Sequence, residues 1–183
     1  PALPKAHLHL HFTGSMAPAT VRELAASHGM RLPYSLTDDV GNTYDVEDER
    51  GWFRFQRTYD AARNCVRGEA DMRRIVREAA LADGAEGSRW LELQVDPTTY
   101  APFVGGITPA LEIVLDEAGA VSELPGAAQV GIMVAASRMR HPLEARTLAR
   151  LAARYAGEGP GTVVAFGLSN DERRGVTSDF APA

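Results

Sequence analysis

The chain has 183 residues, of which 45% are hydrophobic and 23% charged, a balance typical of one soluble globular domain rather than a disordered segment. The formal net charge of -5 argues against nucleic acid as the main partner, because binding to phosphates needs a basic face. With Cys65 as the single cysteine, no disulfide forms within the chain, and no apolar run approaches the roughly 20 residues of a membrane span. No signal-peptide pattern is present, so we expect a cytoplasmic protein without membrane or nucleic-acid partners.

The first predicted element is a strand over about residues 5–12, where histidines and apolar residues alternate in the run HLHLHF. Successive side chains of a strand point to opposite faces, so His7, His9 and His11 are expected on one face. The other face is expected to carry the apolar residues Leu8, Leu10 and Phe12. Such a strand suits the wall of a barrel that holds a metal ion, although a half-buried strand with a wet polar face shows the same pattern.

Helical patterns follow the first strand. Pro18 suits the first turn of a helix, and Gly29 supplies a left-handed residue that ends it. Residues 31–51 are polar and rich in turn formers, and they predict a long exposed loop whose acidic residues, at 38–39 and 47–49, are solvated rather than metal-binding. Two helices come next, the first with an apolar stripe of Trp52, Phe55, Tyr59, Ala62 and Val66. The second carries a stripe of Met72, Ile75, Val76, Ala79 and Ala80.

The rest of the chain alternates between strands and helices. Strands are predicted over residues 90–95, 130–136 and 162–168. Between them, Thr108 and Pro109 predict a helix start, and Pro142 predicts another. Apolar strands that alternate with helices indicate a parallel sheet covered by helices, either a doubly wound sheet or an eight-stranded α/β barrel. The turn after the first strand, HFTGSM, holds one glycine and lacks a dinucleotide-binding pattern, so the barrel is favoured.

Several segments, in order, resemble the adenosine deaminase family of metal-dependent amidohydrolases. They are PKAHLHLHFTGS, GWFRFQRTYDAARNCV, WLELQVDP and VVAFGLSNDE. The resemblance implies a TIM-type (β/α)8 barrel, of which this chain supplies about the first four β/α units, with residues 42–84 forming a loop and lid helices after the first unit. It also implies hydrolytic deamination of a purine nucleoside, in which a zinc-activated water attacks the carbon that bears the amino group.

The same resemblance assigns roles to residues. His9 and His11 are implied as zinc ligands, and Gly14 lets the backbone approach the sugar of the substrate closely. Phe53 and Phe55 are implied as part of an apolar lid over the base, with ordinary core packing as the open alternative. Asn170 and Asp171 end the fourth strand, where the family holds the purine ring.

Three positions depart from the family pattern. His7 replaces a glutamate, and we interpret it as a buried, hydrogen-bonded histidine rather than a third ligand. Thr13 replaces an aspartate that accepts a hydrogen bond from the ribose 5′-hydroxyl. Thr13 and Ser15, which the resemblance implies as substrate-binding residues, are neutral, whereas a carboxylate repels phosphate. Asn170 replaces a glycine. These departures disfavour plain adenosine and predict a nucleoside substrate modified on its 5′ side.

A complete barrel takes about 250 residues, so we expect further strands outside this chain. In the family, strands five to eight bring a third histidine ligand, an aspartate ligand and the glutamate and histidine that move protons. We therefore expect no catalytic residue here, and a complementary C-terminal half-barrel, from the same gene product or a second polypeptide, as partner. Alone, the chain is expected to be inactive and prone to self-association.

Two other functions stay open. A non-catalytic half-barrel would bind a nucleoside or a protein without chemistry, and it would hold no metal. A related amidohydrolase would act on a ring amine other than a purine, and ammonia release from a panel of substrates would separate it from a purine deaminase.

Overall fold

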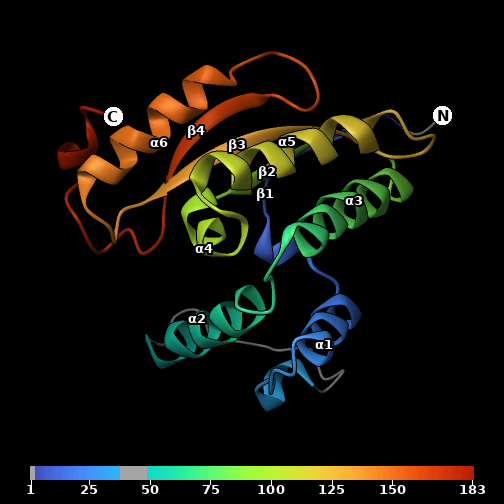
Figure 1. Cartoon of the computed structure of the whole chain (residues 1–183), viewed down its shortest axis with the longest axis horizontal. Helices are drawn as coiled ribbons and strands as arrows, with labels where there is room; N and C mark the ends of the chain where they lie inside the picture. Colours follow the sequence, from blue (N-terminus) through green and yellow to red (C-terminus); the bar gives the residue numbers. More distant parts are fainter. Residues whose placement is uncertain (1–2, 38–48) are drawn as a thin grey trace.

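The computed structural model describes residues 3–37 and 49–183, and its centre is one parallel sheet of four strands (Figure 1). The strands are β1 (Lys5–His11), β2 (Ser88–Val95), β3 (Gln129–Ser137) and β4 (Val163–Ser169). They lie in the order β1-β2-β3-β4, so each strand pairs with the next one in the sequence. All four predicted strands are confirmed to within two residues at each end.

Helices connect the strands. The α-helices are α1 (Pro18–Ser27), α2 (Glu49–Arg63), α3 (Glu69–Ala85), α4 (Ala101–Val104), α5 (Ile107–Ser122) and α6 (Pro142–Arg154). Short 3-10 helices are η1 (Thr13–Ser15), η2 (Tyr34–Leu36), η3 (Pro97–Thr99) and η4 (Thr177–Phe180). Helices α3, α5 and α6 lie along the sheet, whereas α1 and α2 are set apart from it (Figure 1). No described helix combines the length and the hydrophobicity needed to cross a bilayer.

The hydrophobic core lies between the sheet and helices α3, α5 and α6. Alternate residues of the two central strands point into it and are at most 1% exposed, namely Leu91, Leu93, Val95, Val130, Ile132 and Val134. The intervening residues face the other side of the sheet, where Trp90 and Met133 are only half-buried. One face of the sheet is therefore covered by helices as in a barrel wall, and the opposite face carries the polar and small residues of the site described below.

Two predicted helix starts need correction. The fifth α-helix begins at Ile107 with Gly106 before it, so Thr108 and Pro109 lie inside its first turn rather than capping it. Helix α2 begins at Glu49, earlier than the apolar stripe suggests. Of the predicted loop, residues 38–48 lie outside the described residues, and so do the acidic side chains interpreted as solvated. The predicted start at Pro142 is confirmed, with His141 accepting a hydrogen bond from the backbone of Leu143.

A bulge in β1 changes the direction in which its histidines point. The pairing with β2 shifts register between His7 and Leu10, where β1 has one residue more than its partner. His9 takes a left-handed conformation there, with a φ of 73°. His7 therefore points to the helix side, where its Nδ1 donates to Asp83 of α3, 3.0 Å from each carboxylate oxygen. The prediction that three histidines share one face is wrong, because the bulge separates His7 from the other two.

The bulge also changes the burial predicted for this strand. The interpretation of His7 as a hydrogen-bonded residue is confirmed, but its burial is not, because its side chain is 40% exposed. Leu8 does not pack on the core and is 61% exposed. Leu10 and Phe12 pack against the core as predicted. The alternation of the sequence therefore holds on either side of the bulge and fails across it.

Candidate functional site

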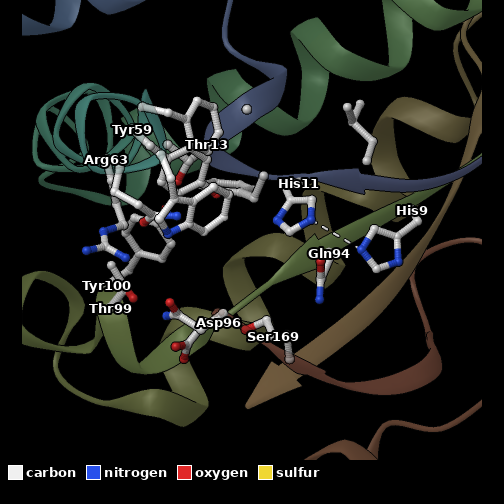
Figure 2. A pocket seen from close by; sticks show the side chains of 18 residues that line it. His9, His11, Thr13, Tyr59, Arg63, Gln94, Asp96, Thr99, Tyr100 and Ser169 are labelled. Carbon is white, nitrogen blue, oxygen red and sulfur yellow. Dashed lines mark hydrogen bonds between the residues drawn. The ribbon is translucent and has the colours of Figure 1, made fainter. Parts of the chain in front are cut away.

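A cavity of about 510 Å³ opens where the carboxyl ends of the strands meet helix α2 (Figure 2). In α/β proteins with parallel strands, this edge of the sheet is where ligands bind. The lining comes from β1 and the turn after it, from α2, from β2 and the loop after it, and from the ends of β3 and β4. It comprises His9, Leu10, His11, Phe12, Thr13, Gly14, Trp52, Phe55, Gln56, Tyr59, Arg63, Gln94, Asp96, Thr99, Tyr100, Ala135, Ser169 and Asn170.

His9, which lies in the bulge, and His11, which follows it, converge on one point of the cavity wall (Figure 2). Nε2 of His9 lies 3.2 Å from Nε2 of His11, and the ring centroids are 5.0 Å apart. Two nitrogens on one tetrahedral zinc ion are about 3.3 Å apart, because each Zn–N bond measures about 2.0–2.1 Å. Desolvation in the cavity, helped by the neighbouring His9, lowers the pKa of His11, and the neutral ring is the form that binds metals. The spacing of the pair therefore fits zinc, and the lowered pKa of His11 favours the neutral, metal-binding form of that ring.

This pair alone is not a complete zinc site. Within residues 3–37 and 49–183, no group of three or more His, Cys, Asp or Glu side chains is placed to hold a metal ion. Catalytic zinc usually has three protein ligands and one open position. A complete site therefore needs at least one ligand in addition to His9 and His11.

Two residues with a strained backbone conformation line this cavity. His9 and Asn170, with φ values of 73° and 85°, are the non-glycine residues with positive φ in the described part of the chain, and both line the cavity. Each such conformation costs about 1–3 kcal/mol, and such residues cluster at functional sites. The Asn170 side chain, which donates from Nδ2 to Oγ of Ser137 at 3.1 Å, helps to hold its turn in place.

Helix α2 presents an aromatic wall to the cavity. The rings of Trp52 and Phe55 are 5.7 Å apart between centroids, and those of Phe55 and Tyr59 are 6.0 Å apart. Phe55 is 38% exposed, so core packing is not its role in this structure. Phe53 points elsewhere on the same helix, is 47% exposed and does not line the cavity. The structure therefore brings Phe55, but not Phe53, to the predicted site.

The turn after β1 supplies a polar wall. The Thr13 hydroxyl is buried and lies 2.9 Å from the hydroxyl of Tyr100, and burial raises the pKa of both Tyr100 and Tyr59. Gly14 lies between His11 and Tyr59, and a Cβ there would be 3.6 Å from Cβ of His11. A side chain at Gly14 would extend into the cavity, whereas the glycine leaves it open.

Two other predicted substrate residues lie outside the cavity lining. The Ser15 hydroxyl donates to the backbone oxygen of Phe12 at 2.9 Å. Asp171 accepts from Nε and Nη2 of Arg173, at 2.9 and 3.1 Å, and these bonds hold the pKa of its carboxyl below the usual value. Their present contacts stabilise the turns after β1 and β4.

Sequence reasoning missed several cavity residues. Arg63 lies one turn after Tyr59 on α2, and helical spacing could have placed it on the same face. Gln94 alternates with the apolar residues of β2, and Asp96 follows the carboxyl end of that strand, so both had a pattern that could have identified them. Thr99 and Tyr100 lie in the loop after β2, and no pattern in the sequence indicates where that loop folds.

Comparison with known proteins identifies the family. A family model described as adenosine deaminase matches residues 4–183. The chain belongs to the adenosine deaminase family. The resemblance predicted from the histidine motif and the three later segments is therefore confirmed.

Among curated members of this family, a putative adenosine/adenine deaminase from Streptomyces virginiae is 60% identical over 178 residues. The alignment covers 97% of this chain and 51% of that protein. A putative adenosine/adenine deaminase from Streptomyces coelicolor is 59% identical, with 97% and 52% covered. The chain thus spans about half the length of the curated relatives that it matches.

The chain is similar in structure to the N6-mAMP deaminase MAPDA from Arabidopsis, with a TM-score of 0.76 and 25% sequence identity. The superposed region covers 98% of this chain and 54% of the Arabidopsis chain. The likeness confirms the predicted fold class: the four parallel β/α units are about half of a deaminase-type barrel.

Proposed function

We propose that this chain supplies the metal- and substrate-binding first half of a zinc-dependent purine deaminase, whose substrate is a nucleoside modified at the 5′ position. Water adds to the ring carbon that bears the amino group, and the bond between that carbon and the amino nitrogen then breaks. Ammonia is released, and the product is an oxopurine. Helix α2, which lines the cavity and serves as the lid, and the remaining barrel strands complete the enzyme. Helix α3 packs on the sheet as part of the core and is not part of that lid. The proposal rests on one observation above all, the convergence of His9 and His11 at the cavity wall.

Zinc is the cofactor that this pair suits best. The 3.2 Å between the two Nε2 atoms matches adjacent ligands of a tetrahedral ion, and imidazole nitrogen is a preferred zinc ligand. When bound, zinc supplies Lewis-acid chemistry that activates water for hydrolysis. The wider family contributes support, because the solved amidohydrolases of this fold include one crystallised with bound Zn.

The chain's own residues bind and orient the purine. The rings of Trp52, Phe55 and Tyr59 offer an apolar surface against which a flat base stacks. Asn170 also lines the cavity, and the N–H of its amide that does not donate to Ser137 is proposed to donate to a ring nitrogen. A base that stacks on the aromatic wall beside the histidine pair presents its amino-bearing edge to the metal position.

The 5′ modification is proposed from the polar wall. Thr13 carries no charge, and its hydroxyl is already engaged with Tyr100, so it gives a free 5′-hydroxyl no strong acceptor. The guanidinium of Arg63 lines the same end of the cavity; it pairs with Asp60 through Nη2 at 2.7 Å, and its other N–H groups are proposed to meet an anionic substituent. A neighbour of the same fold is named an N6-mAMP deaminase, a name that denotes a 5′-phosphorylated substrate.

The decisive experiment measures zinc content and ammonia release in the protein with its complete barrel. His9→Ala and His11→Ala should each remove most of the bound zinc and the ammonia release. His7→Ala is the matched control, because it removes an imidazole from the same strand on the helix side, and zinc should stay bound. Full zinc occupancy in a folded His9→Ala, His11→Ala double variant contradicts the proposal.

A further inference from the structure

Gln94, near the end of β2, is a buried glutamine whose carbonyl oxygen lacks a partner. The residue is 5% exposed, lines the cavity, and has no hydrogen bond to Oε1 from any described residue. A buried acceptor without a donor destabilises a protein, so such an atom points to a partner gained in the functional state. The proposed function does not yet use this amide.

Other polar groups near the histidines are already engaged. Asp96 accepts at Oδ1 from the backbone N–H of Thr98 at 3.0 Å and from its hydroxyl at 2.6 Å. The Ser169 hydroxyl donates to a backbone oxygen of β3 at 3.2 Å. Among the described residues that line this end of the cavity, Gln94 is therefore the buried side-chain acceptor that still needs a donor.

A matching donor lies on the neighbouring strand. His11 is the register partner of Gln94, so both side chains leave the same face of the sheet, and Figure 2 shows the Gln94 amide beside the His11 ring. Nε2 of His11 faces His9, while no described residue accepts from Nδ1 of His11. A histidine that binds zinc through Nε2 carries its proton on Nδ1, and that N–H is normally held by an acceptor.

We propose that Gln94 is a positioning residue for the zinc site: with metal on His9 and His11, its Oε1 accepts the Nδ1–H of His11. This inference rests on the proposed function, because it requires zinc at the histidine pair. Gly167 of β4 lies beside the same amide: a Cβ there would be in ordinary van der Waals contact with Nε2 of Gln94, at 3.7 Å.

The test measures zinc affinity by competition with a chromophoric chelator, in the protein with its complete barrel. Gln94→Leu removes the acceptor at similar volume and should weaken zinc binding about 10- to 100-fold. Gln94→Glu keeps an acceptor at the same place and should retain the affinity. Gln56→Leu is the matched control, because Gln56 lines the same cavity from α2, and it should leave zinc affinity unchanged.

Two results would overturn the inference, and both differ from failure of the proposed function. Wild-type zinc affinity in a folded Gln94→Leu variant removes any role for the amide at the metal. Equal losses in Gln94→Leu and Gln94→Glu indicate a packing role instead. If Gln94→Leu does not fold, Gln94→Met replaces it with the same expected loss. A wild-type protein that binds no zinc contradicts the proposed function itself.

Discussion

The hydroxyls of Thr13 and Tyr100 lie 2.9 Å apart and join the turn after β1 to the loop after β2. Both residues are almost fully buried, with 6% and 3% of their surfaces exposed. The Tyr100 ring also packs edge-on against Phe12, with 5.2 Å between ring centroids. One wall of the cavity is therefore held by a buried contact between segments that are 87 residues apart in sequence.

Loss of this contact should destabilise the fold measurably. Tyr100→Phe removes the buried hydrogen bond to the Thr13 hydroxyl, which keeps only its contact with Tyr59, and should lower the free energy of unfolding by about 1–2 kcal/mol, measured by urea denaturation. Thr13→Val should cost a similar amount. The double variant should lose clearly less than the sum of the two, because both single changes break one interaction. Strict additivity would show that the two hydroxyls do not stabilise each other.

The sheet was predictable from the sequence because its central strands are apolar runs between helical patterns. Residues 90–95 alternate between apolar and polar side chains, residues 130–136 form a continuous apolar run, and turn-forming residues lie near their ends. The structure forms a strand over each of these segments. The aromatic wall was predictable in part, since helical spacing places Phe55 with Trp52 and Tyr59 and leaves Phe53 off that face.

The bulge and the polar wall were not predictable in this way. Nothing in the run HLHLHF indicates an extra residue, because a bulge is defined by the pairing of β1 with β2. The contact of Thr13 with Tyr100 depends likewise on how two loops meet, and Oε1 of Gln94 is recognised as unpartnered only once its surroundings are known. Which residues reach the cavity from loops, or through the register of two paired strands, therefore depends on the tertiary structure.

Gly84 should be intolerant of any side chain. A Cβ at this position in α3 would lie 2.0 Å from the backbone oxygen of Gly126, a distance that requires the backbone to move. We expect Gly84→Ala to lower the free energy of unfolding by about 1–3 kcal/mol, although alanine favours helices more than glycine does. Gly159→Ala is the control, because nothing lies within 4 Å of its Cβ position. Equal unfolding midpoints for the two variants would contradict this packing argument.

The isolated segment of residues 1–183 should self-associate. In the described sheet, β1 and β4 are edge strands with unpaired backbone groups, and Trp90 and Met133 are half-buried on the face away from the helices. Light scattering on the purified segment should give a mass above that of one chain, and added C-terminal half-barrel should reduce it. A segment that stays monomeric at all concentrations would contradict this expectation.

The charge at position 13 should control the choice of substrate. Thr13→Asp places a carboxylate at the polar wall, where it accepts a hydrogen bond from a free 5′-hydroxyl and repels a 5′-phosphate. Thr13→Asn has the same shape without the charge and controls for the loss of the contact with Tyr100. Relative to Thr13→Asn, the aspartate should lower the ratio of kcat/KM for adenosine 5′-monophosphate over adenosine about tenfold or more, because like charges at close range are costly.

The ratio is measured by ammonia release in the protein with its complete barrel. Equal ratios in the two variants would place the 5′ substituent away from Thr13, and a wild-type preference for adenosine would exclude the modified nucleoside as substrate.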